Sequence, residues 1–192
     1  MEYFVYTINE ALELFGKEET LSLNRQISLW AKKLLIHTFN KKGFSFSPSI
    51  GYKENGKPFF INNKDIFFNL SHTKNFIAIA FSNTDIGIDI EKKRKYKKEI
   101  VKRFFHNKEC SLLENIEDEN LQDELFTRIW TIKEAYLKCT GKGIANNLNT
   151  FYITINDKNN TIFEIKDNDT PVSLIHLYDK KTQLYISICQ TL

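Results

Sequence analysis

Ile86-Gly87-Ile88-Asp89-Ile90-Glu91 is the most informative stretch of this chain, because its side chains alternate in character without a break. Successive side chains of a β-strand point to opposite faces, so the three isoleucines share one face and Gly87, Asp89 and Glu91 share the other. The isoleucine face predicts a strand packed on a core. The opposite face carries two carboxylates one strand repeat apart, beside a glycine that leaves room for access.

Two carboxylates at that separation repel each other unless a cation lies between them. Hard cations such as Mg²⁺ take oxygen ligands, commonly one or two carboxylates together with substrate phosphates and water. Asp89 and Glu91 therefore indicate half of a metal–phosphate site. Taken alone, the strand also fits a simpler interpretation, in which its polar face meets solvent as in many antiparallel sheets.

The composition predicts a protein with a sizeable packed core. Apolar residues make up 42% of the 192 residues, and 16 of them are phenylalanines. The net charge of +3 is too small to indicate a nucleic-acid-binding protein by itself. The N-terminus lacks a signal-peptide pattern and no apolar run approaches a membrane span, so we expect a cytoplasmic protein that contacts no membrane. The three cysteines fit neither a disulfide framework nor a zinc site, which agrees with a reducing compartment.

The periodicity along the rest of the chain predicts an α+β protein. Helices are expected at residues 20–41, 96–105, 107–115 and 121–140. Strands are expected at residues 3–8, 49–53, 58–61, 66–70, 76–82, 86–91, 151–156, 161–166, 172–178 and 183–190. The order of strand, helix and further strands occurs twice, which predicts two similar α+β halves, residues 1–84 and 85–192.

Turn and cap residues sharpen some of these boundaries. Asn55-Gly56 predicts a tight turn, Asp157 to Asn160 predicts another, and Asn107 is expected to cap the helix that it opens. Gly43 and Gly141 are expected to end the two longest helices. The uninterrupted apolar run from Phe76 to Phe81 predicts a strand buried on both faces.

The helix at 121–140 supplies groups that match the carboxylate strand. An apolar stripe at helical spacing comprises Leu125, Ile129, Ile132 and Tyr136, and a polar stripe comprises Thr127, Thr131, Glu134 and Lys138. Glu134 is a third carboxylate for a metal ion, and Lys138, one turn later, is placed to hold a phosphate oxygen. The alternative is an exposed Glu–Lys pair at i,i+4, which is common on helices.

A second group of polar residues lies in the first half of the chain, at Gly56-Lys57-Pro58 and Phe68-Asn69-Leu70-Ser71-His72. A lysine, a hydroxyl and an imidazole near a strand end make a reasonable phosphate pocket, although a single histidine is more commonly structural. The chain has no glycine-rich phosphate loop of the Walker or dinucleotide kind. Ser71 and His72 are strand neighbours whose side chains diverge, so they do not predict a nucleophile triad.

A basic run occupies residues 92–98, with the basic residues Lys92, Lys93, Arg94, Lys95, Lys97 and Lys98. Such a run is either solvated surface or a contact for an acidic or phosphorylated partner.

These motifs together resemble one family. The ordered set comprises Gly56-Lys57-Pro58, Phe68 to His72, Ile86 to Glu91, Arg103-Phe104-Phe105 with Glu109, and Trp130-Thr131-Ile132-Lys133-Glu134-Ala135-Tyr136-Leu137-Lys138. The set resembles the 4′-phosphopantetheinyl transferases, in the monomeric double-domain type that activates surfactin synthetase. The resemblance covers roughly residues 20–145, and although each motif is weak, their order and separation are specific.

The resemblance implies a fold and a reaction. The fold is a pseudo-twofold pair of α+β halves with the active site between them. The reaction moves phosphopantetheine from coenzyme A to a serine of an apo acyl or peptidyl carrier protein and releases adenosine 3′,5′-bisphosphate. The expected cofactor is Mg²⁺, with Mn²⁺ as the alternative, and coenzyme A is the co-substrate.

The resemblance also implies roles for single residues. Asp89, Glu91 and Glu134 would bind the metal ion together with the pyrophosphate of coenzyme A, which Lys138 would also contact. The expected coenzyme A contacts besides Lys138 are Arg25, Lys57, Ser71 and His72. Glu109 matches a candidate general base. The serine's proton acceptor stays open among Glu109, a metal-bound hydroxide and Glu134 acting through a water.

Two other functions remain open on sequence grounds. A Mg²⁺-dependent hydrolase would cleave pyrophosphates with water, and a non-enzymatic protein would use residues 92–98 to bind an acidic protein or nucleic acid. The preferred hypothesis is a monomeric transferase that contacts no nucleic acid.

Overall fold

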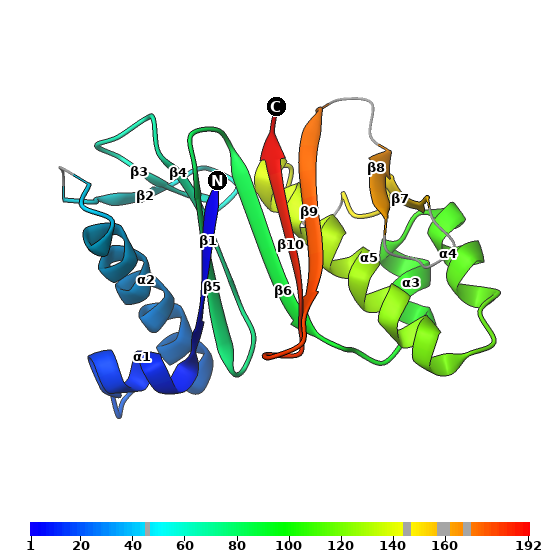
Figure 1. Ribbon diagram of the computed structural model, residues 1–192, viewed down its shortest axis with the longest axis horizontal. Helices are drawn as coiled ribbons and strands as arrows, with labels where there is room; N and C mark the ends of the chain where they lie inside the picture. The colour runs from blue at the N-terminus through cyan, green and yellow to red at the C-terminus, as the bar shows by residue number, and fades with distance from the viewer. Residues whose placement is uncertain (45–46, 144–146, 157–161, 167–169) are drawn as a thin grey trace.

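The protein folds into four layers, as a computed structural model shows for residues 1–44, 47–143, 147–156, 162–166 and 170–192. Two sheets lie side by side in the centre, with α1 and α2 on one outer flank and α3 to α5 on the other (Figure 1). The mixture of helices and strands confirms the predicted α+β class. The helices are α1 (Ile8–Phe15), α2 (Leu23–Lys41), α3 (Lys98–Phe104), α4 (Asn107–Glu114) and α5 (Glu119–Thr140).

Each central sheet has three strands, and each is matched by a separate two-stranded ribbon. The first sheet has the order β1-β5-β4 and the ribbon β2-β3; the second sheet has the order β6-β10-β9 and the ribbon β7-β8. The strands are β1 (Glu2–Thr7), β2 (Ile50–Tyr52), β3 (Pro58–Phe60), β4 (Phe67–His72), β5 (Phe76–Ser82), β6 (Ile86–Lys92), β7 (Tyr152–Ile155), β8 (Phe163–Lys166), β9 (Val172–Asp179) and β10 (Leu184–Thr191). All strand pairs are antiparallel.

The two sheets repeat one topology. In each, the first strand of the half pairs with the last strand, and the last strand pairs with the one before it. In each, helices and the ribbon are inserted between the first strand and the final two. The change from one sheet to the other occurs between Ser82 and Ile86, where β5 ends and β6 begins. This match supports the proposal of two similar halves, 1–84 and 85–192.

Alternation along the strands divides the apolar residues among three cores. In β5, Ile77 and Ile79 face α2, whereas Ala78 and Ala80 face the second sheet. The predicted burial of β5 on both faces is therefore confirmed. The isoleucines of β6 pack against those alanines, so the core between the sheets contains the apolar face that the sequence predicted.

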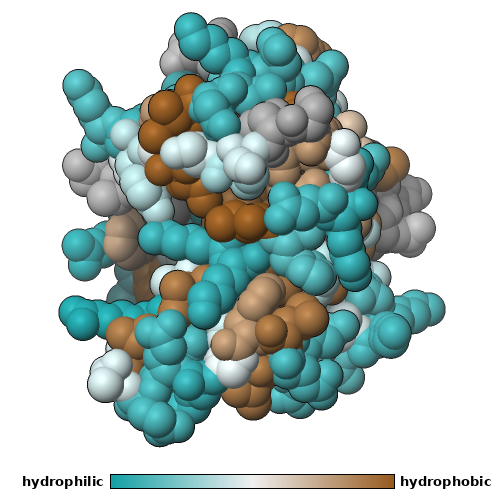
Figure 2. Space-filling view, turned by 90° about the vertical axis from the view of Figure 1, so that its left-hand side faces the viewer, coloured by the Kyte–Doolittle hydropathy of each residue, from teal (hydrophilic) through white to brown (hydrophobic). Residues whose placement is uncertain are grey.

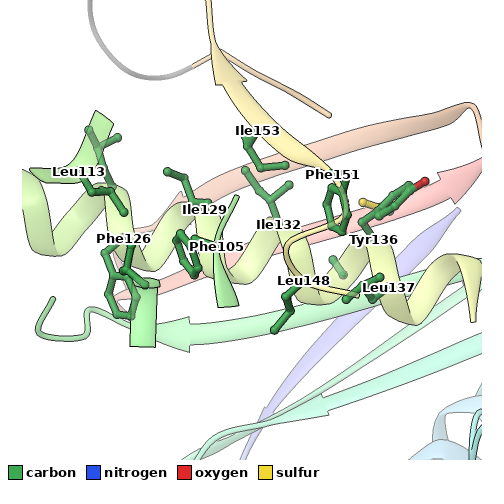
Figure 3. Packing of buried hydrophobic residues seen from close by; sticks show 14 of the residues in the cluster. Phe105, Leu113, Phe126, Ile129, Ile132, Tyr136, Leu137, Leu148, Phe151 and Ile153 are labelled. Atoms are coloured by element: carbon green, nitrogen blue, oxygen red, sulfur yellow. The ribbon is translucent and has the colours of Figure 1, made fainter. Parts of the chain in front are cut away.

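The core of the second half surrounds α5 (Figure 3). The four members of the predicted apolar stripe, Leu125, Ile129, Ile132 and Tyr136, are all buried. The opposite end of the molecule has exposed apolar side chains such as Leu12 and Leu14 of α1 and Phe59 of β3. Figure 2 shows this end, where brown areas above and below are separated by a band of hydrophilic side chains.

Several boundaries differ from the predictions. Helix α1 is not among the predicted helices, although Thr7 and Glu10 form a capping box at its start. The helix expected from residue 20 begins at Leu23. His106, not Asn107, is the N-cap of α4: its Nδ1 accepts a hydrogen bond from the Lys108 N–H, and Glu109 completes the capping box. Histidine is an uncommon cap, so composition favoured the neighbouring asparagine.

The expected turns at Asn55-Gly56 and Gly141 are confirmed. The Gly56 N–H donates to the Lys53 carbonyl at 2.8 Å, and Gly141 ends α5 with φ +71°. The expected turn from Asp157 to Asn160 lies outside the described residues.

Candidate active site

Strand β6 lies unusually close to helix α5. A Cβ atom added to Gly87 would lie 2.1 Å from the Ala135 carbonyl oxygen and 2.3 Å from the Cys139 nitrogen. Only glycine therefore permits this contact between strand and helix. Because Asp89 follows two residues later on the same face of the strand, it is brought next to the polar side of α5.

Asp89 is the centre of a buried polar cluster formed by β4, β6 and α5. Its Oδ1 accepts hydrogen bonds from the Lys138 Nζ at 2.6 Å and from the Ser71 Oγ at 2.8 Å. Its Oδ2 is buried and has no hydrogen-bond partner among the described residues. A buried, unpartnered carboxylate oxygen is costly unless another group binds it.

The other two predicted metal ligands flank this aspartate. The Glu134 Oε2 lies 3.6 Å from the Lys138 Nζ. Desolvation, followed by the charge of Asp89, raises the pKa of Glu134 to about 7. Desolvation and the Asp89 charge also raise the pKa of Glu91, whose Oε1 accepts from Arg94 at 3.1 Å. Within the part of the chain that the structure describes, however, no three such side chains converge closely enough to hold a metal ion.

Lys138 supplies the positive charge of the cluster. Desolvation alone would lower the pKa of its amine, but Asp89 and Glu134 outweigh that effect and the pKa is raised. Lys138 also donates to the Ile88 carbonyl at 3.2 Å. The amine therefore stays protonated and neutralises one of the carboxylates.

Lys138 lines a cleft of about 250 Å³ between the two halves. The β2–β3 turn, β4 and the end of α5 form its walls, with Asn55, Lys57, Asn69, Leu70, Leu137 and Gly141 among the lining residues. The side chain of Asn55 donates a hydrogen bond to the Gly141 carbonyl across the halves. The cleft therefore lies beside the buried carboxylates, with a lysine in its wall.

The predicted coenzyme A contacts divide into two groups. The Ser71 hydroxyl donates its one hydrogen to Asp89 and lies inside the cluster, while the exposed His72 is near enough to Lys138 that desolvation and then that charge lower its pKa. Their divergence along β4 is as expected. Lys57 lines the cleft, but its Nζ donates to Asp85 at 2.7 Å and to the Cys139 carbonyl at 2.8 Å, so it joins the two halves.

Arg25 and Glu109 are not brought into this cluster. Arg25 lies on α2 and lines a separate surface hollow with Asn24, Ser28 and Lys32. Glu109 is enclosed in the second core, where Oε1 accepts from Lys133 at 2.8 Å and from the Ile153 N–H at 2.8 Å, and Oε2 accepts from the His106 N–H at 3.0 Å. Its neighbours satisfy both oxygens, which does not favour a role in direct proton transfer.

The sequence predicts no contact within the site for Asn69, Lys133 or Arg94. Asn69 and Ser71 are two residues apart on β4, so strand periodicity would have placed them on one side. Arg94 belongs to the basic run, yet its guanidinium lies 4.9 Å from the Trp130 ring centre and pairs with Glu91. The contacts of Asn69 with Ile88 and of Arg94 with Trp130 join elements that are distant along the chain, so local patterns do not predict them.

Comparison with known proteins identifies the family of this chain. The family model described as the 4′-phosphopantetheinyl transferase superfamily matches residues 85–189, which hold β6, α5 and the second sheet. The chain belongs to the 4′-phosphopantetheinyl transferase superfamily. The family predicted from the motifs is thereby confirmed.

Curated 4′-phosphopantetheinyl transferases are similar over most of this chain. One from Bacillus subtilis is 33% identical over 159 residues, which are 81% of this chain and 70% of that protein. Sfp of Bacillus subtilis strain 168 is 34% identical and covers 71% of this chain, and gsp of Aneurinibacillus migulanus is 37% identical and covers 76%. The matched regions are 60% and 59% of those two proteins.

A solved structure of holo-[acyl-carrier-protein] synthase from Thermotoga maritima is also similar. The matched region is 56% of this chain and 62% of the synthase chain, with a TM-score of 0.41 and 13% sequence identity.

Proposed function

We propose that this protein transfers the 4′-phosphopantetheine group of coenzyme A to a serine of an apo carrier protein. The serine oxygen attacks the phosphorus next to the pantetheine. A new P–O bond forms as the bond to the adenosine bisphosphate breaks, and the serine proton passes to a base. Membership of the superfamily and the activity in the names of its relatives support this reaction.

One observation carries the assignment of the site. Asp89 is 3% exposed and has one oxygen bound by two donors and one oxygen without a partner among the described residues. One of those donors, Lys138, lines the cleft between the halves. A group buried in this way contributes little to stability and is well suited to hold a ligand. Lys138 beside it supplies positive charge toward an anionic substrate in the cleft.

The residues around Asp89 fit a hard divalent cation in their chemistry. Asp89, Glu91 and Glu134 offer carboxylate oxygens, and desolvation, followed by the charge of Asp89, raises the pKa of both glutamates. Because they do not yet converge, binding Mg²⁺ or Mn²⁺ requires these side chains to turn toward Asp89 Oδ2. A bound ion would neutralise charge on the pyrophosphate and the leaving group.

The chain's own residues supply the rest of the chemistry. Lys138 would hold a pyrophosphate oxygen, and Ser71 keeps Asp89 oriented through its single hydroxyl hydrogen. Glu109 is a poor proton acceptor, because both of its carboxylate oxygens accept hydrogen bonds inside the second core. Glu134 acting through a water is therefore the better candidate. Lys57 and His72 would contact coenzyme A from the cleft wall and its rim.

The proposal includes a monomer that acts in the cytoplasm on an acyl or peptidyl carrier protein and contacts neither nucleic acid nor membrane. The three cysteines are free thiols, which agrees with a reducing compartment. No helix among the described residues is long and apolar enough to cross a membrane.

Intact-protein mass spectrometry tests the proposal. An apo carrier protein is incubated with this protein, coenzyme A and Mg²⁺, with an EDTA-treated reaction as the control. We expect the carrier to gain one phosphopantetheine, and to gain none with EDTA. Bisphosphate release without a carrier would instead favour a hydrolase. No transfer to fatty-acid, polyketide or peptide-synthetase carriers, together with no coenzyme A binding, would overturn the proposal.

A further inference from the structure

The free edge of β6 is closed by side chains instead of by another strand. One edge of β6 pairs with β10, and the other lies beside β4 without a backbone ladder between them. The Ile88 N–H donates to the Asn69 Oδ1 at 3.0 Å, and the Ile90 N–H donates to the Ser71 Oγ at 3.3 Å. These two N–H groups lie on either side of Asp89 in the chain.

The backbone of Ile88 is therefore held on both of its polar groups. Its N–H is bound by Asn69, and its carbonyl oxygen accepts from the Lys138 Nζ at 3.2 Å. Asn69 is 4% exposed, so water cannot readily replace its oxygen as the acceptor. Loss of that oxygen would leave a buried N–H unpaired directly beside Asp89, and the strand would have to shift to satisfy it.

We propose that Asn69 is a positioning residue for the transfer reaction. Its side chain crosses from the first half to the second and fixes the backbone of β6, so that Asp89 keeps Oδ1 on Ser71 and Lys138 and leaves Oδ2 available to a cation. This inference rests on the proposed function. It assigns Asn69 no contact with the reacting atoms.

The position of Ser71 supports this role for Asn69. The Ser71 hydroxyl donates to Asp89 and accepts from the Ile90 N–H and from Lys138 at 3.3 Å. With its hydrogen and both lone pairs engaged, Ser71 cannot also take over the Ile88 N–H. Asn69 therefore has no substitute among the groups bound at this edge.

The test compares Asn69→Ala and Asn69→Leu with Asn69→Asp, which keeps an acceptor oxygen. Three quantities are measured: the dissociation constant for Mn²⁺ alone by EPR titration, the kcat and KM for coenzyme A, and the urea midpoint. For Asn69→Ala and Asn69→Leu we expect Mn²⁺ binding weakened by about 10- to 100-fold and kcat lowered by a similar factor. Asn69 lines the cleft, but its side-chain oxygen is engaged with the Ile88 N–H, so the KM for coenzyme A should change by a smaller factor than kcat. Asn69→Asp should restore most of both losses.

Thr38→Val is the matched control. It removes a buried hydroxyl of the first half that bonds the Leu34 carbonyl at 2.7 Å and Tyr6 at 2.8 Å, on helix α2, which packs against α1, β4 and β5. It should lower the urea midpoint while leaving Mn²⁺ affinity and kcat unchanged.

The outcomes separate this inference from the proposed function. If the wild-type protein transfers phosphopantetheine, and Asn69→Ala shows the wild-type kcat and Mn²⁺ affinity, the positioning role is wrong and the proposed function stands. Failure of Asn69→Asp to restore either quantity would also overturn the role. A wild-type protein without transfer to any carrier would overturn both.

Discussion

Helix α5 carries two lysine–carboxylate pairs that are built in opposite ways. Lys133 and Glu109 are both fully buried; the carboxylate oxygens are all bound, and Lys133 also donates to the Phe151 carbonyl at 2.8 Å. Lys138 and Asp89, one and a half turns further along, leave one carboxylate oxygen without a partner. A satisfied buried pair joins elements of the fold, whereas an unsatisfied pair beside a cleft is available to a ligand.

The largest effect should follow from breaking the satisfied pair. Lys133→Met leaves Glu109 as an uncompensated buried charge, so the free energy of unfolding should fall by about 3–5 kcal/mol. Urea denaturation measures the loss. The double variant Lys133→Met, Glu109→Leu serves as the control and should recover much of it, because no buried charge remains. A single variant as stable as wild type would contradict the structural role of this pair.

Breaking the unsatisfied pair should affect the reaction more than the fold. Lys138→Met removes the positive charge beside the cleft, so kcat/KM for transfer should fall by about 10²- to 10³-fold. Lys142→Met is the control. It removes a lysine two residues beyond the end of α5 and should change the transfer rate little. Equal losses in the two variants would indicate a general effect of charge on coenzyme A binding, not a specific role for Lys138.

The sequence predicted that Asp89, Glu134 and Lys138 lie together, but not what surrounds them. The strand alternation of Asp89 and the helical spacing of Glu134 and Lys138 are local patterns, and they put these groups on facing elements as observed. The burial of Glu109 depends on contacts with α5 and β7, which are distant in sequence. Local pattern therefore identified a carboxylate at 109 without revealing that the fold encloses it.

The same limit applies to the fold. The two-half order and the buried β5 follow from periodicity, and both helix-ending glycines have positive φ. The hydrogen bonds from the β6 backbone to Asn69 and Ser71 of β4 could not be predicted, because they form only when the two sheets lie side by side. Helix α1 is short, and only its capping box marked it.

His176 tests whether every unpartnered buried atom marks a ligand site. Its Nε2 is buried without a partner among the described residues, its Nδ1 bonds Ser187 at 2.8 Å, and burial and then Arg128 lower its pKa to about 3. Because the pKa is lowered on folding, the unfolded chain binds the proton more tightly, and stability should fall as the pH drops below about 6.5.

His176→Gln should remove this acid sensitivity. Between pH 7 and pH 5 the wild type should lose about 2 kcal/mol more than the variant, as urea titrations at each pH would measure. Transfer at pH 7 should be unchanged, since this atom is not in the cleft. A variant with little transfer would show that the second sheet contributes a further group to the site.

The smallest expected effect concerns the basic run. Arg94 faces Glu91 and Trp130, so only outward lysines of the run suit a docking test. Lys93 and Lys97 are exposed, and replacing both by Glu should raise the KM for an acidic carrier by about 3- to 10-fold, more at low salt. An unchanged KM would reassign the run to solvated surface.

The most direct test is the transfer rate of the Asp89→Ala variant. The rate is measured without urea, at a temperature where circular dichroism shows that the variant is folded. Asp89 holds the only buried carboxylate oxygen without a hydrogen-bond partner among the described residues, so its removal should reduce transfer by at least about 10³-fold while the protein stays folded. A folded Asp89→Ala protein that modifies the carrier at a rate near that of wild type, even at limiting Mg²⁺, would contradict the account.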